Sequence, residues 1–140
     1  MDAKEFLKQP GRIDLQIKNK LIEQQQWRDI ALGITANMDG ERVRSSTGAK
    51  SKMADAIDRC VDMEAEIDRL IDQLVDIKKD VIRTIEKLDS ATEYNVLHMR
   101  YIQGISLQDV ADHYGYDYSW ATTCHGRALK SVQALLDAVE

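Results

Sequence analysis

The most regular hydrophobic pattern in the chain lies between residues 53 and 88. Side chains that pack well in a helical seam recur there at every seventh position without a break. This series contains Met53, Cys60, Ile67, Leu74, Val81 and Leu88. A second series, three residues further on, contains Ala56, Met63, Leu70, Ile77 and Thr84. A seven-residue repeat of this kind predicts one long helix that packs along another helix.

The apolar stripe of this predicted helix is wider than a single partner helix would cover. Ile57, Ile71 and Ile85 directly follow the second series and extend the stripe to one side. We therefore expect a partner helix within the chain, folded back antiparallel, and a second copy of the chain on the surface that remains. The predicted homodimer interface uses residues 11–34 and eight positions of the long helix: Met53, Cys60, Ile67, Leu70, Ile71, Leu74, Ile77 and Val81.

The antiparallel partner is predicted in residues 11–34. Apolar side chains recur there at spacings of three and four residues, with a gap at Gln24. Pro10 and Gly11 precede this segment and predict a break after a short first helix. The pattern thus predicts an antiparallel helical hairpin over residues 1–88.

Residues 37–51 lose the periodicity and are rich in Gly, Ser, Thr and Asn, which predicts a polar loop. Four basic residues against two acidic ones within residues 37–52 leave two interpretations open. The segment is either a solubilising loop or an arm that touches phosphates.

The hydrophobic pattern changes after Leu88, and residues 89–140 are predicted to form a separate domain of three helices. The signals are capping residues and glycines at the expected helix ends. They are Asp89 or Ser90 and Gly104 for the first helix, Ser106 and Gly115 for the second, and Asp117 for the third. A short helix, a three-residue turn with Gly and a longer helix have helix-turn-helix geometry.

The third helix has an inward stripe and therefore a predictable outward face. Its inward positions are Ala121, Cys124, Ala128, Val132 and Leu135. Ser119, Thr122, Thr123, Gly126 and Lys130 then point outward, with Tyr118 and Trp120 on the flanks. Glycine is costly inside a helix, so Gly126 indicates either close approach of a backbone or phosphate, or accidental tolerance.

The residues V-L-x-M-R-Y-I-x-G-I-S-L-x-D-V-A-x-x-Y-G at 96–115 and H-G-R-A-L at 125–129 also form a recognisable motif. This segment resembles the promoter-binding region 4 of sigma-70-like factors. With the long helix before it, the chain is most similar to phage and prophage transcriptional regulators of the ArpU/RinA type.

The resemblance implies roles for the third helix of the domain. Tyr118, Ser119, Trp120, Thr122 and Thr123 would read bases in the major groove, and Arg127 and Lys130 would contact phosphates. The family places Arg, Gln or Glu at several reading positions, and hydroxyl groups discriminate bases less well. Residues 89–140 also carry three basic and seven acidic residues. We therefore expect a lone domain to bind DNA weakly.

Composition and motifs exclude several other classes of protein. The chain has 140 residues, a net charge of -5 and 44% hydrophobic residues, which argues against disorder and against non-specific coating of nucleic acid. Cys60 and Cys124 form no metal-ligand or disulfide pattern, and no catalytic motif occurs, so we expect no enzyme, no metal and no cofactor. No segment is apolar enough for a signal or membrane anchor, which predicts an intracellular, cytoplasmic protein. The resemblance to phage regulators implies that this cytoplasm is that of a bacterial host.

The sequence thus predicts an all-α protein: a helical hairpin for oligomerisation in residues 1–88, and a helix-turn-helix domain in residues 89–140. Its expected function is sequence-specific binding to duplex DNA as a transcriptional regulator, namely an activator of phage or prophage genes. Contact with RNA polymerase is left open. Two alternatives remain: a DNA-packaging subunit like a small terminase, and a protein-interaction module whose helix-turn-helix does not bind DNA.

Overall fold

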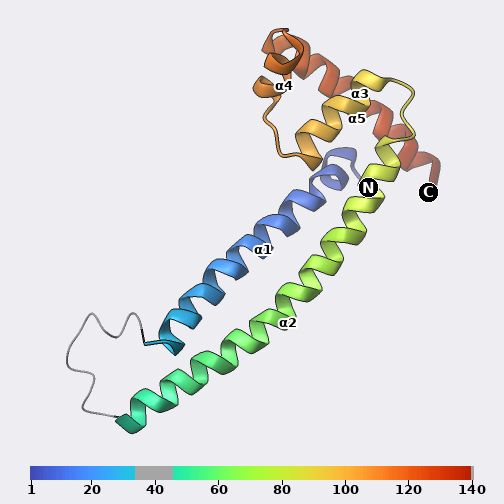
Figure 1. Cartoon of the computed structure of the whole chain (residues 1–140). Helices are drawn as coiled ribbons and strands as arrows, with labels where there is room; N and C mark the ends of the chain where they lie inside the picture. Colours follow the sequence, from blue (N-terminus) through green and yellow to red (C-terminus); the bar gives the residue numbers. More distant parts are fainter. Residues whose placement is uncertain (34–45, 140) are drawn as a thin grey trace. The chain divides into compact units, whose positions relative to one another are not determined.

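The computed structural model describes residues 1–33 and 46–139, with side chains described in 1–33 and 51–139, and every regular element in these ranges is helical (Figure 1). The elements are α1 (Ala3–Ala31), α2 (Ser46–Ile85), α3 (Ala91–Leu97), η3 (His98–Ile102), α4 (Leu107–Tyr114) and α5 (Tyr118–Val139). The predicted all-α class, with a long antiparallel helix pair before three packed helices, is confirmed. No described helix combines the length and apolar character needed to span a bilayer.

Helix α1 continues through the position where the sequence predicted a break. Pro10 lies inside the helix, so the expected end of a short first helix at Pro10–Gly11 is wrong. Proline removes one backbone donor from a helix interior. Leu7, Pro10 and Ile13 are all buried, because their spacing places them on one face, and this packing outweighs the local preference. The helix stops at Ala31, shortly before Gly33, which has a φ of +73°.

Helix α2 begins earlier than the heptad pattern predicted. Residues 46–51 are helical, so the predicted loop over residues 37–51 is wrong for that part, while residues 37–45 lie outside the described residues. No proline or other obligatory breaker separates Ser46 from the heptads, so the helix extends toward the N-terminus. It ends at Ile85, close to the predicted end at Leu88.

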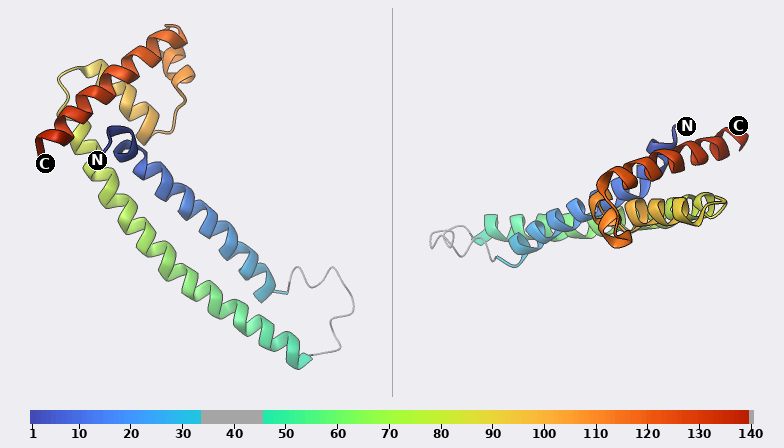
Figure 2. Two further views of the ribbon diagram at one scale, coloured as in Figure 1. Left: turned by 180° about the vertical axis from the view of Figure 1, so that it is seen from behind. Right: turned by 90° about the horizontal axis from the view of Figure 1, so that it is seen from above.

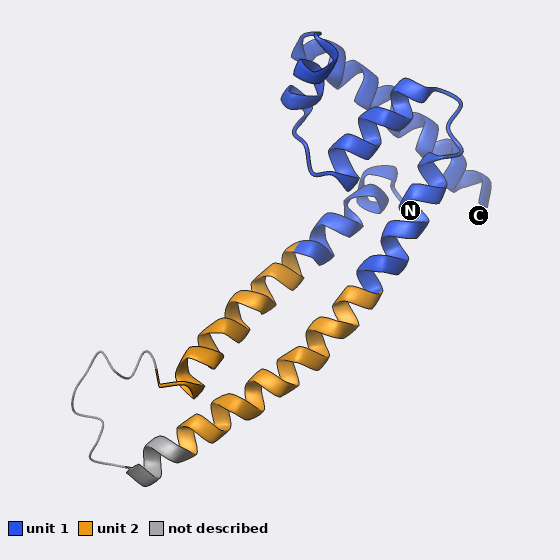
Figure 3. Ribbon diagram, in the orientation of Figure 1, with its two compact units in different colours: residues 1–14, 73–140 blue, residues 15–72 orange. Residues whose placement is uncertain are grey.

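The chain divides into two compact units, which Figure 3 distinguishes by colour. Unit 1 consists of residues 1–14 and 73–140, and unit 2 of residues 15–72. The division falls within α1 and within α2, whereas the sequence placed a boundary between residues 88 and 89. That boundary concerned function as well as packing, and the assignment of function to residues 89–140 stays a prediction.

The core of unit 1 explains why the compact unit extends beyond residue 89. Leu7 of α1 and Val81 and Ile85 of α2 are fully buried and pack with Leu97 of α3 and Val132 of α5. The start of α1 and the end of α2 therefore complete the hydrophobic core beneath the three C-terminal helices. Figure 2 shows these helices from two further sides.

The predicted caps of the three C-terminal helices are confirmed. The backbone N–H of Glu93 donates to Ser90 Oγ at 3.2 Å, and that of Asp109 donates to Ser106 Oγ at 3.2 Å. The N–H of Trp120 donates to Asp117 Oδ1 at 2.9 Å. These bonds satisfy donors that a helix start leaves unpaired. Gly115 ends α4 with a φ of 73°, the left-handed conformation that favours glycine.

A π-helical segment, η3, continues α3 and was not predicted. The backbone N–H of Gln103 donates to His98 O at 3.0 Å, five residues back. Such segments are rare, and hydrophobic periodicity does not distinguish them from ordinary helix. The segment carries Tyr101 toward α5, where it contacts His125.

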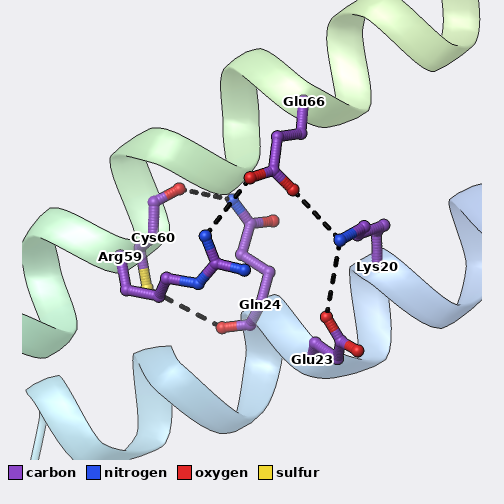
Figure 4. Close-up of polar contacts among 6 residues, drawn as sticks. All are labelled: Lys20, Glu23, Gln24, Arg59, Cys60 and Glu66. Atoms are coloured by element: carbon purple, nitrogen blue, oxygen red, sulfur yellow. Dashed lines mark hydrogen bonds and ion pairs between the residues drawn. The ribbon is translucent and has the colours of Figure 1, made fainter.

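Unit 2 contains a polar layer between α1 and α2 (Figure 4). Gln24 fills the gap in the apolar pattern of α1 and is 7% exposed. Its side-chain N–H donates to Cys60 O at 3.1 Å, and Cys60 Sγ donates to Gln24 O at 3.7 Å. The Glu66 carboxylate forms ion pairs with Lys20 at 3.1 Å and with Arg59 at 3.2 Å. The hydrogen bonds in these pairs, above all the one from Lys20, hold the pKa of Glu66 below its usual value. Because a buried amide needs a partner, the layer favours one register of the pair.

Candidate nucleic-acid interface

Helix α5 packs against α3 and α4 through the face that the sequence predicted. Ala121, Ala128 and Val132 are fully buried, and Cys124 and Leu135 are half-buried. Small residues at the first two positions allow α5 to lie close to its neighbours. The first turns of α5 are thereby fixed to the rest of unit 1 with the opposite face exposed.

Most of the predicted DNA-contacting residues lie together on that exposed face of α5. Six are exposed, namely Tyr118, Ser119, Thr122, Thr123, Arg127 and Lys130. The other two, Trp120 and Gly126, are half-buried. A helix of this kind is the part of a helix-turn-helix that enters the major groove in known complexes.

Trp120 belongs to an aromatic cluster around the turn between α4 and α5. Its ring lies 5.0 Å from that of Tyr114 and 4.7 Å from that of Tyr116, between ring centres. Such contacts stabilise the turn beyond simple burial. Tyr116 is 57% exposed, and its contact with Trp120 was not predicted from the sequence.

The hydroxyl groups of the face differ in their availability. Thr122 Oγ1 donates to Ser119 O at 2.9 Å, so its proton is used within the helix. Ser119 and Thr123 have exposed side chains whose hydroxyl groups bond to nothing within the part of the chain that the structure describes. These two hydroxyl groups are the free donors and acceptors at the start of α5.

The basic residues of the face stand further along α5. Arg127 and Lys130 are exposed, and neither forms an ion pair with any described residue. Ser131 donates to Glu93 Oε1 at 2.8 Å, which ties that carboxylate to α5 by a neutral hydroxyl group. The two cations remain available to an external anion.

His125 lies on the packed side of α5 and joins it to η3. Tyr101 Oη and His125 Nε2 share a hydrogen bond of 2.7 Å, and the two rings are stacked. Burial, and then the charges of Lys4 and Arg100, lowers the pKa of His125, while burial raises the pKa of Tyr101. A neutral imidazole that accepts from the tyrosine hydroxyl group satisfies both effects. His125 entered the sequence prediction only as part of the H-G-R-A-L motif, and this contact with Tyr101 was not predicted.

Gly126 is not required by the packing of the chain itself. A Cβ atom at this position would meet no heavy atom within 4 Å. Both interpretations therefore stand: close approach of a partner's backbone or phosphate, or accidental tolerance. Within the described residues no neighbour requires glycine at this position.

The predicted homodimer residues of α2 are mostly covered within a single chain. Ile67 and Val81 are buried. Half-buried positions are Met53, Cys60, Leu70, Leu74 and Ile77. Only Ile71, which is 42% exposed, presents a large accessible surface. The heptad seam therefore joins the two helices of one chain, and the homodimer interface stays a prediction.

Comparison with known proteins shows the family of this chain. A family model described as a protein of unknown function, DUF1492, matches residues 35–133. The chain belongs to the DUF1492 family. The match extends over α2 and the C-terminal helices into α5, and it leaves α1 outside. No curated protein and no solved structure matches the chain.

Proposed function

We propose that this DUF1492 protein is a transcriptional regulator that binds duplex DNA sequence-specifically, with α5 as its recognition helix. The observation that carries the proposal is the exposed polar face of α5, held rigidly behind a left-handed Gly115 turn. The motif at residues 96–115, similar to sigma-70 region 4, supports a role at promoters of phage or prophage genes, as in activators of the ArpU/RinA type. Duplex DNA and a second copy of the chain are its proposed partners.

The residues of the face have distinct roles in this proposal. Ser119 and Thr123 offer hydroxyl groups to base edges, and Tyr118 offers apolar contact to thymine methyl groups. Arg127 and Lys130 contact phosphates and set the register of α5 on the duplex. Trp120 supports the turn through Tyr114 and Tyr116 and contributes only its exposed edge.

The charge of the domain predicts weak binding by one copy. Three basic and seven acidic residues in 89–140 leave few cations to neutralise phosphates. Two copies on two half-sites would raise the effective affinity, because the second contact becomes intramolecular.

Titration of the full chain onto labelled duplexes from the DNA flanking its own gene, with shuffled duplexes as competitors, tests the proposal. We expect a footprint on one sequence and preference over the shuffled DNA. Ser119→Ala or Thr123→Ala should change base preference at one position by about fivefold, less than loss of a bidentate contact would cause. Thr92→Ala is the matched control, because Thr92 is an exposed threonine of α3 that lies outside the candidate interface.

Absence of any DNA complex at low salt would overturn the proposal and favour a protein-interaction module. Equal effects of all three hydroxyl substitutions would remove Ser119 and Thr123 as base contacts.

A further inference from the structure

The start of α1 lies beside α5 within unit 1 (Figure 2). The backbone N–H of Ala3 donates to Gln133 Oε1 of α5 at 2.7 Å. Ala3 is 3% exposed, and Leu7 is fully buried in the same core as Ala128 and Val132 of α5. These contacts fix the first turns of α1 against α5, so α1 adds its own side chains to the surface next to the proposed recognition helix.

Two cations from different elements meet beside His125 of α5. Lys4 follows Ala3 on α1, and Arg100 stands on η3, where its guanidinium carbon lies 5.6 Å from the ring centre of Tyr101. Tyr101 Oη shares a hydrogen bond of 2.7 Å with His125 Nε2, which holds this part of η3 against α5. After burial, the charges of Lys4 and then Arg100 help to lower the pKa of His125, as two cations near its ring should. We call Lys4 and Arg100 the cationic corner.

The carboxylates within the described residues leave the cationic corner unpaired. Lys4 is exposed and Arg100 is half-buried, and neither forms an ion pair with another described residue. The acidic residues next to Lys4 in the sequence have other partners. Glu5 pairs with Arg12 at 2.8 Å, and Asp2 Oδ2 accepts the backbone N–H of Glu5 at 3.2 Å. The corner therefore keeps its positive charge for an external anion.

The cationic corner and Arg127 border opposite sides of the exposed face of α5. Because successive residues of a helix are rotated by about 100°, Arg127 lies about 160° around α5 from His125. Ser119 and Thr123 lie between these two positions on the exposed side of the helix. The phosphates of the two DNA strands flank the major groove, so a helix in the groove has phosphates on both sides. Cations on both sides of the polar face match this arrangement.

We propose that Lys4 of α1 contacts a phosphate on the DNA strand opposite to the one that Arg127 contacts, within the cationic corner that it forms with Arg100. The inference rests on the proposed function, because it needs α5 in the major groove. Lys4 then supplies positive charge to a domain that has three basic and seven acidic residues in 89–140. It also extends the DNA interface to α1, which lies outside the residues matched by the DUF1492 family model.

Neutral phosphate analogues in the footprinted duplex test this contact. Single methylphosphonate substitutions should weaken binding of the full chain at positions on both strands, and one of these positions should depend on Lys4. Lys4→Gln should weaken binding to every sequence alike and lower the slope of log K against log salt by about one. It should also abolish the effect of the methylphosphonate at that one position, since the phosphate there has already lost its partner.

Lys79→Gln is the matched control, because Lys79 is an exposed lysine of α2 in the same unit, and it should change neither the slope nor the methylphosphonate pattern. Lys4→Arg should retain the contact, and thermal unfolding checks that the three variants remain folded. If the wild-type chain binds its site and Lys4→Gln keeps the full slope and pattern, this inference is overturned while the proposed function stands. A wild-type chain that forms no complex at low salt would overturn both.

Discussion

The two compact units differ most in the kinds of side chain that they expose. Unit 1 closes a core of fully buried residues such as Leu7, Leu97 and Val132, and presents on α5 a face of hydroxyl and basic groups. Unit 2 buries a polar residue, Gln24, in its seam and leaves nine large apolar residues exposed. A polar face on a rigid core suits contact with a charged, hydrated partner. Exposed apolar side chains on a helix pair suit contact with another protein surface.

The two long helices also contribute unequally, along their length, to the hydrophobic core of unit 1. Their ends near Leu7 and Val81 are part of the core beneath α3 and α5, while residues 15–72 pack mainly on one another. Substitutions on the same helix should therefore have very different consequences, depending on the unit in which they fall.

The largest expected effect comes from truncating Leu7, which lies outside the region with the helix-turn-helix motif. Leu7 is fully buried, so Leu7→Ala should destabilise unit 1 by about 2–5 kcal/mol. Denaturant unfolding followed by Trp120 fluorescence, in a Trp27→Phe background, measures unit 1 directly. Leu15→Ala is the matched control: its side chain is 59% exposed, and the change should stay within about 0.5 kcal/mol. Equal stabilities of the two variants would mean that α1 does not complete the core of unit 1.

Substituting two glycines near the start of α5 should change the stability of unit 1 by smaller amounts and in opposite directions. Gly115 has a φ of 73°, so Gly115→Ala should destabilise unit 1 by about 1–2 kcal/mol. Gly126 lies within α5 with open space around it, so Gly126→Ala should stabilise by up to about 1 kcal/mol. Thermal unfolding of both variants measures the difference. If Gly126→Ala is stable but binds DNA more weakly, Gly126 is a point of close approach; unchanged binding identifies it as accidental tolerance.

The smallest effect concerns pH and the half-buried His125. Its pKa lies below the ordinary value of 6.5 in the folded chain, mainly because of burial. The unfolded chain therefore takes up the proton first as the pH falls, so stability is full above pH 6.5 and declines below it. His125→Gln should flatten this decline between pH 7.5 and about pH 5, whereas His113→Gln, an exposed control, should not. Identical slopes for wild type and His125→Gln would remove His125 as the cause.

Much of the fold could be predicted from local chemistry. The heptads predicted the long α2, and Ser90, Ser106, Asp117 and Gly115 predicted the ends of the C-terminal helices, because capping depends on residues close in sequence. The continuation of α1 through Pro10 could not be predicted, since it depends on a buried face completed by other elements.

The candidate site shows the same limit. The exposed face of α5 follows from its own periodicity, so the sequence identified Ser119, Thr123 and Lys130 correctly as surface residues. The contacts of Trp120 and His125 could not be predicted, because they are made with Tyr116 in the turn and with Tyr101 in the π-helical segment. The e-position isoleucines indicated a second partner, but only the packed seam shows which side of α2 remains open.

The salt dependence of DNA binding shows whether α5 faces DNA. If it does, the full chain should bind its footprinted site with an affinity that falls as salt rises, and Arg127→Ala with Lys130→Ala should lower the log–log slope by about two. Lys79→Ala with Arg83→Ala on α2 removes the same charge from another exposed part of unit 1 and should leave the slope nearly unchanged. Equal slopes for wild type and the Arg127/Lys130 variant, with binding intact, would contradict the assignment of α5 as the recognition helix.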